Sequence, residues 1–327
     1  MTKNVFGTRD TFKPFSYPWA YDLWLEHEKM HWVSREVPLH EDLRDWRNNL
    51  TTSDQLFLTD VFLLFTQGDI DVANGYVQDY LPHFAHPEIR MMLLGFASRE
   101  ATHIDAYSYL IETLGKPDDF YSRFLDIPAM RDKHIFFENV MNGSDDRMHL
   151  PLQIAGISAF TEGMFLFSSF AMLLNYPRHG LMKGMGQIIT WSILDEQKHV
   201  EGLTKIFRTI IDENKEWWND DMKREIYSTA ELMTELEIDF ISHIFGDLKE
   251  IRGLKKSDLI DYIKYIVNRR LIALGMKGIH KVNTNPLPWV DQMISSQNHE
   301  NFFENRATSY AKGATTGSWD SVWGKYK

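Results

Sequence analysis

The sequence of 327 residues contains no cysteine. Disulfide bonds, thiolate zinc sites, iron–sulfur clusters and cysteine nucleophiles are therefore excluded. A transition metal in this chain has to be held by histidine and carboxylate side chains. The chain also lacks an excess of positive charge, since 35 Lys and Arg face 46 Asp and Glu, for a net charge of −11. Because such a surface repels phosphate backbones, we expect no nucleic-acid binding.

Two further signals are missing or scarce. The N-terminal residues MTKNVFGTRDTFKPF contain no apolar signal core, so we expect a soluble, cytoplasmic protein. Short β-branched runs between tight turns are nearly absent, whereas long segments of helical periodicity dominate. The expected helices cover about 18–32, 51–80, 87–114, 151–175, 180–212, 220–246 and 256–274. Long helices joined by short links predict an all-α bundle.

The segment 151–175 contains a single charged residue, Glu162, near its middle. Its length and polarity alone would allow a membrane helix. No basic cluster flanks it and no other segment is comparably apolar, so a helix buried inside a soluble bundle is preferred and no membrane association is expected. A lone carboxylate in such a helix is costly unless a positive group meets it. Glu162 is therefore the first candidate functional residue.

Glutamate and histidine stand three residues apart at Glu28/His31, Glu100/His103 and Glu196/His199. Residues at this spacing share one face of a helix, so both side chains can reach the same metal ion. The first pair lies in a polar segment and is interpreted as a surface pair. The other two pairs each continue a strongly apolar helix, which is the context expected of metal ligands.

A dinuclear carboxylate site takes a Glu-x-x-His from each of two helices and one carboxylate from each of two more. Glu162 provides one single carboxylate, and either Asp69 or Asp71 provides the other. Four carboxylates balance two divalent ions and repel one another without them. These ligands suit iron or manganese. The alternative is a set of satisfied core ion pairs, but no basic residue lies near Glu162 in the sequence.

Tyr107 follows His103 by four residues and therefore lies about 6 Å further along the same helix face. A phenol close to an oxygen-activating metal pair can be oxidised to a radical. Without the neighbouring metal motif, Tyr107 would be interpreted as an ordinary core tyrosine.

Taken together, this pattern resembles the small, radical-generating subunit of class I ribonucleotide reductase, over residues 20–313. The resemblance rests on Asp69, Glu100, His103, Tyr107, Glu162, Asp195, Glu196 and His199. It selects Asp69 over Asp71, because some members of the family have Asp 31 residues before the first Glu-x-x-His. It implies a ferritin-like helical bundle over residues 1–290 that forms a homodimer and holds two metal ions. These ions are expected to be iron, with Mn/Mn or Mn/Fe as alternatives.

The resemblance also implies how the subunit works. The metal pair activates molecular oxygen and oxidises Tyr107, and a manganese form would need a flavoprotein activator. Radical transfer then runs through Asp195 and Trp32 to Tyr310. Residues 291–327 are expected to form a flexible tail that docks on the separate large subunit, where ribonucleotides are reduced to deoxyribonucleotides. A chain without cysteine cannot supply the thiols for that reduction, which supports the division of labour.

The resemblance also implies apolar packing around the radical tyrosine. Leu166 and Phe170 fit that description, whereas Ser192 introduces a hydroxyl where a bulky aliphatic side chain is common. Two other functions use the same scaffold. A di-iron oxidase or oxygenase acting on a bound small molecule keeps the Glu-x-x-His pairs but does not need Trp32, Tyr310 or the aromatic tail. An iron-storage bundle of the ferritin type is usually shorter and assembles into a shell. The reductase subunit is preferred.

Overall fold

The chain is described by a computed structural model that covers residues 4–65, 68–141 and 147–300. It divides into two compact units, Met1–Leu287 and Pro288–Lys327. Helices dominate the described residues, and their single sheet is a small hairpin in which β1 (Glu250–Ile251) pairs antiparallel with β2 (Leu254–Lys255). The predicted all-α fold is confirmed.

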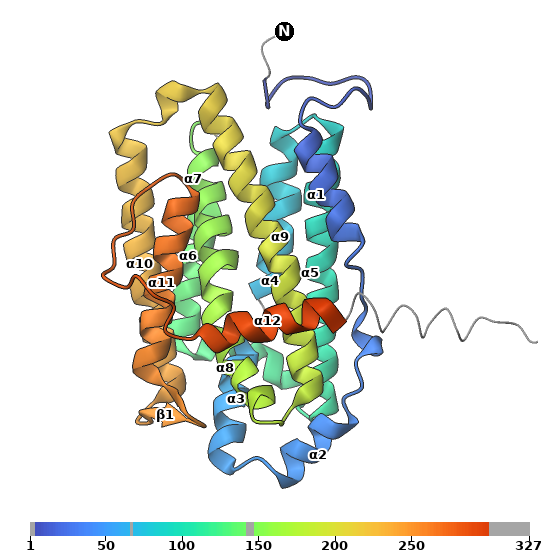
Figure 1. Cartoon of the computed structure of the whole chain (residues 1–327), viewed down its shortest axis with the longest axis vertical. Helices are drawn as coiled ribbons and strands as arrows, with labels where there is room; N and C mark the ends of the chain where they lie inside the picture. Colours follow the sequence, from blue (N-terminus) through green and yellow to red (C-terminus); the bar gives the residue numbers. More distant parts are fainter. Residues whose placement is uncertain (1–3, 66–67, 142–146, 301–327) are drawn as a thin grey trace, which may run out of the picture. The chain divides into compact units, whose positions relative to one another are not determined.

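The first unit consists of long helices that run side by side (Figure 1). Its α-helices are α1 (Pro18–Glu28), α2 (His40–Asn48), α3 (Thr52–Phe65), α4 (Gly68–Asn74), α5 (Pro87–Thr113), α6 (Pro128–Met141), α7 (Leu150–Ala155), α8 (Leu166–Arg178), α9 (Lys183–Glu213), α10 (Asp220–Phe245) and α11 (Lys256–Ala273). Two segments are π-helical: η2 (Gly75–Tyr80) and η5 (Gly156–Phe165). Helices α5 and α9 contact each other, α4 packs on α5, and η5 packs on α9.

Several helix boundaries differ from the expected ones. The first helix ends at Glu28 rather than near 32, because the chain then turns to place Trp32 in the core. The expected helix 51–80 is divided into α3, α4 and η2, and the expected helix 151–175 into α7, η5 and α8. Both π-helical segments begin at a glycine, a residue with a low propensity for the regular α-helix. The short helices α2 and α6 were not expected.

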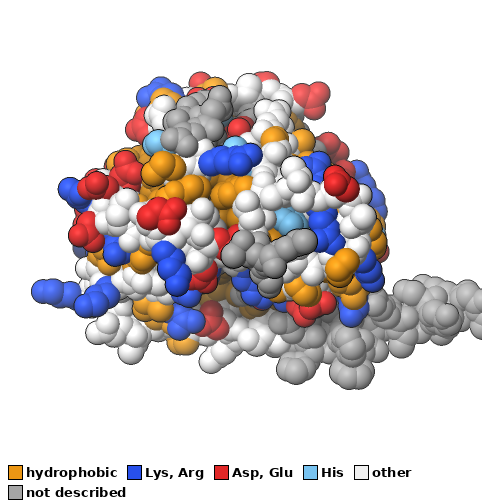
Figure 2. Space-filling model, turned by 90° about the horizontal axis from the view of Figure 1, so that it is seen from above, with side chains coloured by type: hydrophobic (Ala, Val, Ile, Leu, Met, Phe, Trp, Pro, Cys, Tyr) orange, Lys and Arg blue, Asp and Glu red, His pale blue; other side chains and the backbone are white. Residues whose placement is uncertain are grey.

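The apolar run Leu150–Arg178 is long and apolar enough to cross a membrane by length and composition. The bundle buries 94 % of its most apolar stretch. That is the packing of a core helix, as preferred from the sequence. On the outer face shown in Figure 2, acidic and basic side chains are interspersed.

The start of α9 is fixed by acidic residues of α2. Backbone N–H groups of Gly184 and Met185 donate to the carboxylate of Asp42 at 2.9 and 2.7 Å. The N–H of Met182, which has a left-handed φ of 52°, donates to Asp45 at 2.9 Å. Carboxylates at a helix N-terminus satisfy free N–H groups and complement the helix dipole. Helix α2 therefore anchors the helix that carries Glu196 and His199.

The second unit contains α12 (Pro288–Glu300), which begins at a proline, a residue favoured in the first turn of a helix. The expected tail, residues 291–327, begins within α12, which ends at Glu300. Tyr310 and the aromatic C-terminal residues lie outside the described residues.

Candidate metal centre

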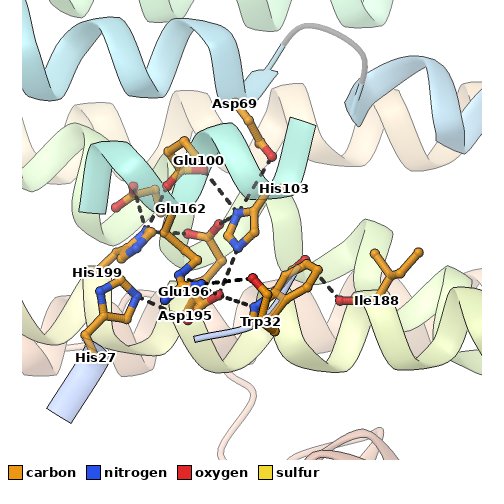
Figure 3. Close-up of polar contacts among 12 residues, drawn as sticks. His27, Trp32, Asp69, Glu100, His103, Glu162, Ile188, Asp195, Glu196 and His199 are labelled. Carbon is orange, nitrogen blue, oxygen red and sulfur yellow. Dashed lines mark hydrogen bonds and ion pairs between the residues drawn. The ribbon is translucent and has the colours of Figure 1, made fainter. Parts of the chain in front are cut away.

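Six predicted metal ligands point toward one another inside the first unit (Figure 3). They are Asp69 on α4, Glu100 and His103 on α5, Glu162 on η5, and Glu196 and His199 on α9. None of the six is more than 2 % exposed. Asp71, the alternative to Asp69, points elsewhere, with its carboxylate 2.8 Å from Nδ1 of His134.

Three carboxylates surround one nitrogen of His103. Its Nδ1 lies 3.2 Å from Oε2 of Glu100, 3.2 Å from Oε1 of Glu196 and 3.9 Å from Oδ2 of Asp69. The acidic oxygens of one potential metal position therefore converge on the side of the imidazole that faces away from Asp195.

His199 has a matching environment. Its Nδ1 lies 2.9 Å from Oε1 of Glu100, 3.3 Å from Oε2 of Glu196 and 3.6 Å from Oε1 of Glu162. Glu100 and Glu196 thus present one oxygen to each histidine, whereas Asp69 lies beside His103 and Glu162 beside His199. Such a set of side chains could hold two metal ions next to each other, with Glu100 and Glu196 within reach of both.

The side chains present fit a pair of divalent ions. Buried atoms without a hydrogen-bond partner include Oδ2 of Asp69, Oε1 of Glu100, Oε2 of Glu162 and Oε2 of Glu196. Among the described residues, no Lys or Arg forms an ion pair with these four carboxylates. Buried charges without partners are strongly unfavourable, so the cluster is suited to bind cations from outside the chain.

Carboxylates and histidines of the cluster shift one another's pKa values. Burial raises the pKa of Asp69 well above its usual range, with the charge of Glu100 adding to the shift. Burial also raises the pKa of Glu162, to about 7. At Glu100, burial is outweighed by His199 and His103, which lower the pKa to about 2. The carboxylates raise the pKa of both histidines well above the usual value, although burial opposes this. The cluster therefore favours protons on Asp69, Glu162 and both histidines, and a bound cation has to compete with them.

Asp195 lies directly behind His103 and is fully buried. It accepts a 2.8 Å hydrogen bond from the indole N–H of Trp32, and its Oδ2 lies 3.2 Å from Nε2 of His103. Burial opposes ionisation, but hydrogen bonds with His103 and His27 hold the pKa of Asp195 well below its usual range. A carboxylate in this position orients the imidazole so that Nδ1 faces the metal positions.

Three contacts around the cluster were missed in the sequence analysis. His27 lies 3.1 Å from Asp195, the guanidinium of Arg99 lies 3.5 Å from the same carboxylate, and Tyr76 donates to Glu162 at 2.6 Å. The burial of His27 had a signal, because it continues the spacing of Ala20 and Leu23 on α1. No comparable signal marks Arg99 or Tyr76.

The polar pair Glu28 and His31 is exposed, as expected of surface residues.

Tyr107 lies one turn beyond His103 on α5 and is 4 % exposed. Its ring centroid is 6.3 Å from that of His103 and 4.7 Å from that of Phe65, which in turn stacks on Phe170 at 5.6 Å. Burial and the charge of Asp69 raise the pKa of Tyr107 well above its usual value. The phenol therefore keeps its proton at rest.

Two further residues expected near the radical tyrosine are buried. Leu166 is 7 % exposed and Ser192 is fully buried. The Ser192 hydroxyl donates to the carbonyl oxygen of Ile188 at 3.0 Å, and its presence beside Tyr107 opposes the rise in the tyrosine pKa. The tyrosine pocket is thus apolar on its Phe65 side and polar on its Ser192 side.

A helical bundle with two Glu-x-x-His pairs and two further carboxylates defines the ferritin-like dinuclear carboxylate proteins. Residues 9–286 match the family described as "Ribonucleotide reductase, small chain". The chain belongs to this family, and it is the small subunit of a class I ribonucleotide reductase, which pairs with a large subunit. The resemblance inferred from the sequence is confirmed, and the oxidase alternative is not favoured.

Relatives and solved structures agree with this assignment. The chain is 44 % identical to the "Probable ribonucleoside-diphosphate reductase small subunit" of Invertebrate iridescent virus 6, over 97 % of this chain and 98 % of the relative. It is 28 % identical to the "Ribonucleoside-diphosphate reductase subunit beta" of Chlamydia pneumoniae, over 91 % and 88 %.

Two solved structures show the same fold. The ribonucleotide reductase R2 subunit from Clostridium botulinum has a TM-score of 0.81 at 22 % identity, over 88 % of this chain and 91 % of that one. The dimanganese(II)-NrdF of Streptococcus sanguinis has a TM-score of 0.76 at 18 % identity, over 88 % and 100 %. The predicted ferritin-like bundle is confirmed.

Proposed function

We propose that this chain generates a radical on Tyr107 and passes it to the large subunit for the reduction of ribonucleotides. The observation that carries the proposal is the pair of carboxylates, Glu100 and Glu196, that each present one oxygen to each histidine. The residues that would hold the ions are Asp69, Glu100, His103, Glu162, Glu196 and His199. When bound, the metal pair supplies the one-electron oxidation of Tyr107, with molecular oxygen as the oxidant.

Two iron ions are the proposed cofactor. Histidine and carboxylate ligands accept iron and manganese alike, so Mn/Mn and Mn/Fe forms are the alternatives. A manganese form would work with a flavoprotein activator. A solved relative by fold, the Streptococcus sanguinis protein, is described as dimanganese(II). Metal analysis of the purified protein decides among these forms.

Tyr107 and its neighbours support the radical step. The buried phenol holds its proton on Oη at rest, and loss of one electron makes that proton strongly acidic. The Ser192 hydroxyl lies beside the phenol, so it offers an oxygen near the departing proton. Phe65 covers the ring and keeps water away from it.

A continuous chain of contacts leads from the cluster toward Trp32. The indole ring stacks on His103 with centroids 5.9 Å apart, and its N–H donates to Asp195, which also contacts His103. These contacts support Asp195 and Trp32 as the start of the transfer route. Tyr310 is its proposed end within this chain, and it lies outside the described residues.

We assign the bundle to residues 1–290 and docking on the large subunit to residues 291–327. The division of the chain into two compact units after Leu287 supports this organisation. The bundle is proposed to work as a homodimer, and the cytoplasm is its proposed location.

Low-temperature electron paramagnetic resonance tests the radical. The metal-free protein is loaded with ferrous iron and exposed to oxygen, and we expect a sharp organic-radical signal. Tyr107→Phe should abolish this signal. Tyr109→Phe is the matched control on the same helix, because Tyr109 packs against Arg35 and should leave the signal intact.

A radical that survives Tyr107→Phe would contradict the assignment of the tyrosine. If two irons bind without any signal, the same experiment is repeated with manganese and a flavoprotein activator. Silence in both forms would contradict the proposed function and favour an oxidase.

A further inference from the structure

Tyr76 lies on the opposite side of the cluster from Tyr107 and has no role in the proposed radical route. It is 1 % exposed, and its hydroxyl donates to Oε1 of Glu162 at 2.6 Å. This length falls in the range of hydrogen bonds from a hydroxyl to an ionised oxygen, which are about twice as strong as neutral ones. The contact joins two segments that lie 86 residues apart in the sequence.

The two oxygens of Glu162 have different surroundings. Oε1 accepts a hydrogen bond from Tyr76 and lies 3.6 Å from Nδ1 of His199, whereas Oε2 is buried and has no hydrogen-bond partner. A carboxylate fixed through one oxygen can turn little about its last bond. The hydrogen bond therefore fixes how Glu162 faces His199 and leaves Oε2 available to a cation.

The phenol is itself held in place. Its ring packs edge-on against Phe96 and His199, with centroids 5.8 and 5.9 Å apart. Both partners of the hydrogen bond also lie on π-helical segments, Tyr76 on η2 and Glu162 on η5. Such segments are rare and often mark functional sites, because the inserted residue redirects the side chains of the turn.

The other single carboxylate is held differently. Among the described residues, Asp69 forms an ion pair with His103 at 3.9 Å, and its Oδ2 has no hydrogen-bond partner. The two metal positions therefore differ in how firmly their terminal carboxylates are held.

We propose that Tyr76 is a positioning residue that orients Glu162 toward the metal ion beside His199, and that this position binds its ion more tightly because of it. The inference rests on the proposed function only in requiring that the cluster hold two divalent ions. It does not depend on a radical.

Binding of Mn²⁺ alone to the full-length metal-free protein tests the inference. We expect the wild type to bind two ions. Tyr76→Phe, which removes only the hydroxyl, should weaken one of the two positions by about 10- to 100-fold, the usual effect of removing a partner that orients a ligand. The other position should change by less than about twofold. Free Mn²⁺ is measured by its electron paramagnetic resonance signal.

Tyr80→Phe is the matched control. Tyr80 is also buried on η2, and its hydroxyl donates to the backbone oxygen of Gln153 at 3.3 Å. We expect both positions to keep their affinity in this variant. An equal loss in Tyr76→Phe and Tyr80→Phe, or no loss in either, would overturn the inference.

Infrared difference spectra on adding Mn²⁺ separate positioning from a general packing effect. Loss of the hydrogen bond should shift a carboxylate band in Tyr76→Phe and in no other tyrosine variant. Weakening of both positions without this shift would also overturn the inference. Wild-type protein that binds two Mn²⁺ ions but forms no radical in either the iron form or the activated manganese form would contradict the proposed function while leaving the role of Tyr76 standing.

Discussion

Glu237 and the carboxylates of the metal cluster are both buried in the first unit, and they are neutralised in different ways. Away from the metal ligands, Glu237 of α10 forms an ion pair with Lys133 of α6 and accepts a hydrogen bond from Ser168 of α8. The Lys133 ammonium also lies 3.9 Å from the ring centroid of Phe240 and 4.3 Å from that of Phe165. One acid thus meets one base, and two aromatic faces stabilise the cation.

The metal cluster has no such internal cation. Four buried carboxylates face two imidazoles, and the described residues place no Lys or Arg beside them. The bundle therefore neutralises Glu237, whose role is structural, with a base of its own. Among the described residues, no Lys or Arg pairs with the carboxylates whose role is to bind ions. An excess of buried acid, rather than a buried acid as such, marks the metal site.

The largest expected effect comes from adding metal. Because the folded protein binds the ions and the unfolded chain lacks the site, Mn²⁺ at about 1,000 times its Kd should raise the free energy of unfolding by about 4 kcal/mol for each ion. Denaturant unfolding with and without Mn²⁺ measures this. Glu196→Ala removes a shared ligand and should lose most of the gain. If Mn²⁺ does not change the unfolding midpoint of the wild type, the cluster does not bind ions and does not differ from Glu237 in the way argued above.

The next largest effect concerns the ion pair between Glu237 and Lys133. Glu237→Ala leaves the Lys133 ammonium buried without its partner, which should lower the free energy of unfolding by about 3–5 kcal/mol. Replacing both, Lys133→Met with Glu237→Leu, should cost much less, because no charge remains buried. Both variants should still bind two Mn²⁺ ions per chain. If the double variant is as unstable as the single one, the ion pair is not the source of the effect.

Much of the metal cluster is predictable from the sequence because its signals are local. Two residues three apart on a helix share a face wherever the helix lies, so Glu100 with His103 and Glu196 with His199 are recognised without a fold. Glu162 is recognised as the one charge in an apolar run. The choice of Asp69 over Asp71 required the family resemblance, because both follow the same apolar segment.

The contacts that support the cluster are not predictable in this way, because they join distant segments. Tyr76 meets Glu162 across 86 residues, and His27 meets Asp195 across 168. The acid that anchors the start of α9, Asp42, comes from a short polar helix and meets the N–H of Gly184 across 142 residues. Local spacing finds the ligands, and tertiary packing decides what orients them.

The smallest expected effect is a dependence on pH that has opposite signs in the metal-free and metal-loaded protein. Burial raises the pKa of Glu162 to about 7 in the folded state, from 4.5 for the free group. Between these values the folded state holds a proton that the unfolded chain has released. The contribution of Glu162 to the free energy of unfolding therefore falls as pH rises from about 4.5 to 7. A metal ion has to displace that proton, so Mn²⁺ affinity rises over the same range.

Unfolding experiments and Mn²⁺ titrations at several pH values between about 5 and 7 measure the two trends. For one displaced proton, the affinity should rise by up to about tenfold per pH unit. Glu162→Gln cannot titrate, so the difference between this variant and the wild type isolates the contribution of the one carboxyl group from those of the histidines. Glu237 provides a contrast within the same protein. Burial raises its pKa too, but its partner is the Lys133 ammonium, so we expect no competition between protons and Mn²⁺ at this carboxyl group. Identical pH dependence in the wild type and in Glu162→Gln would show that the proton is held elsewhere in the cluster.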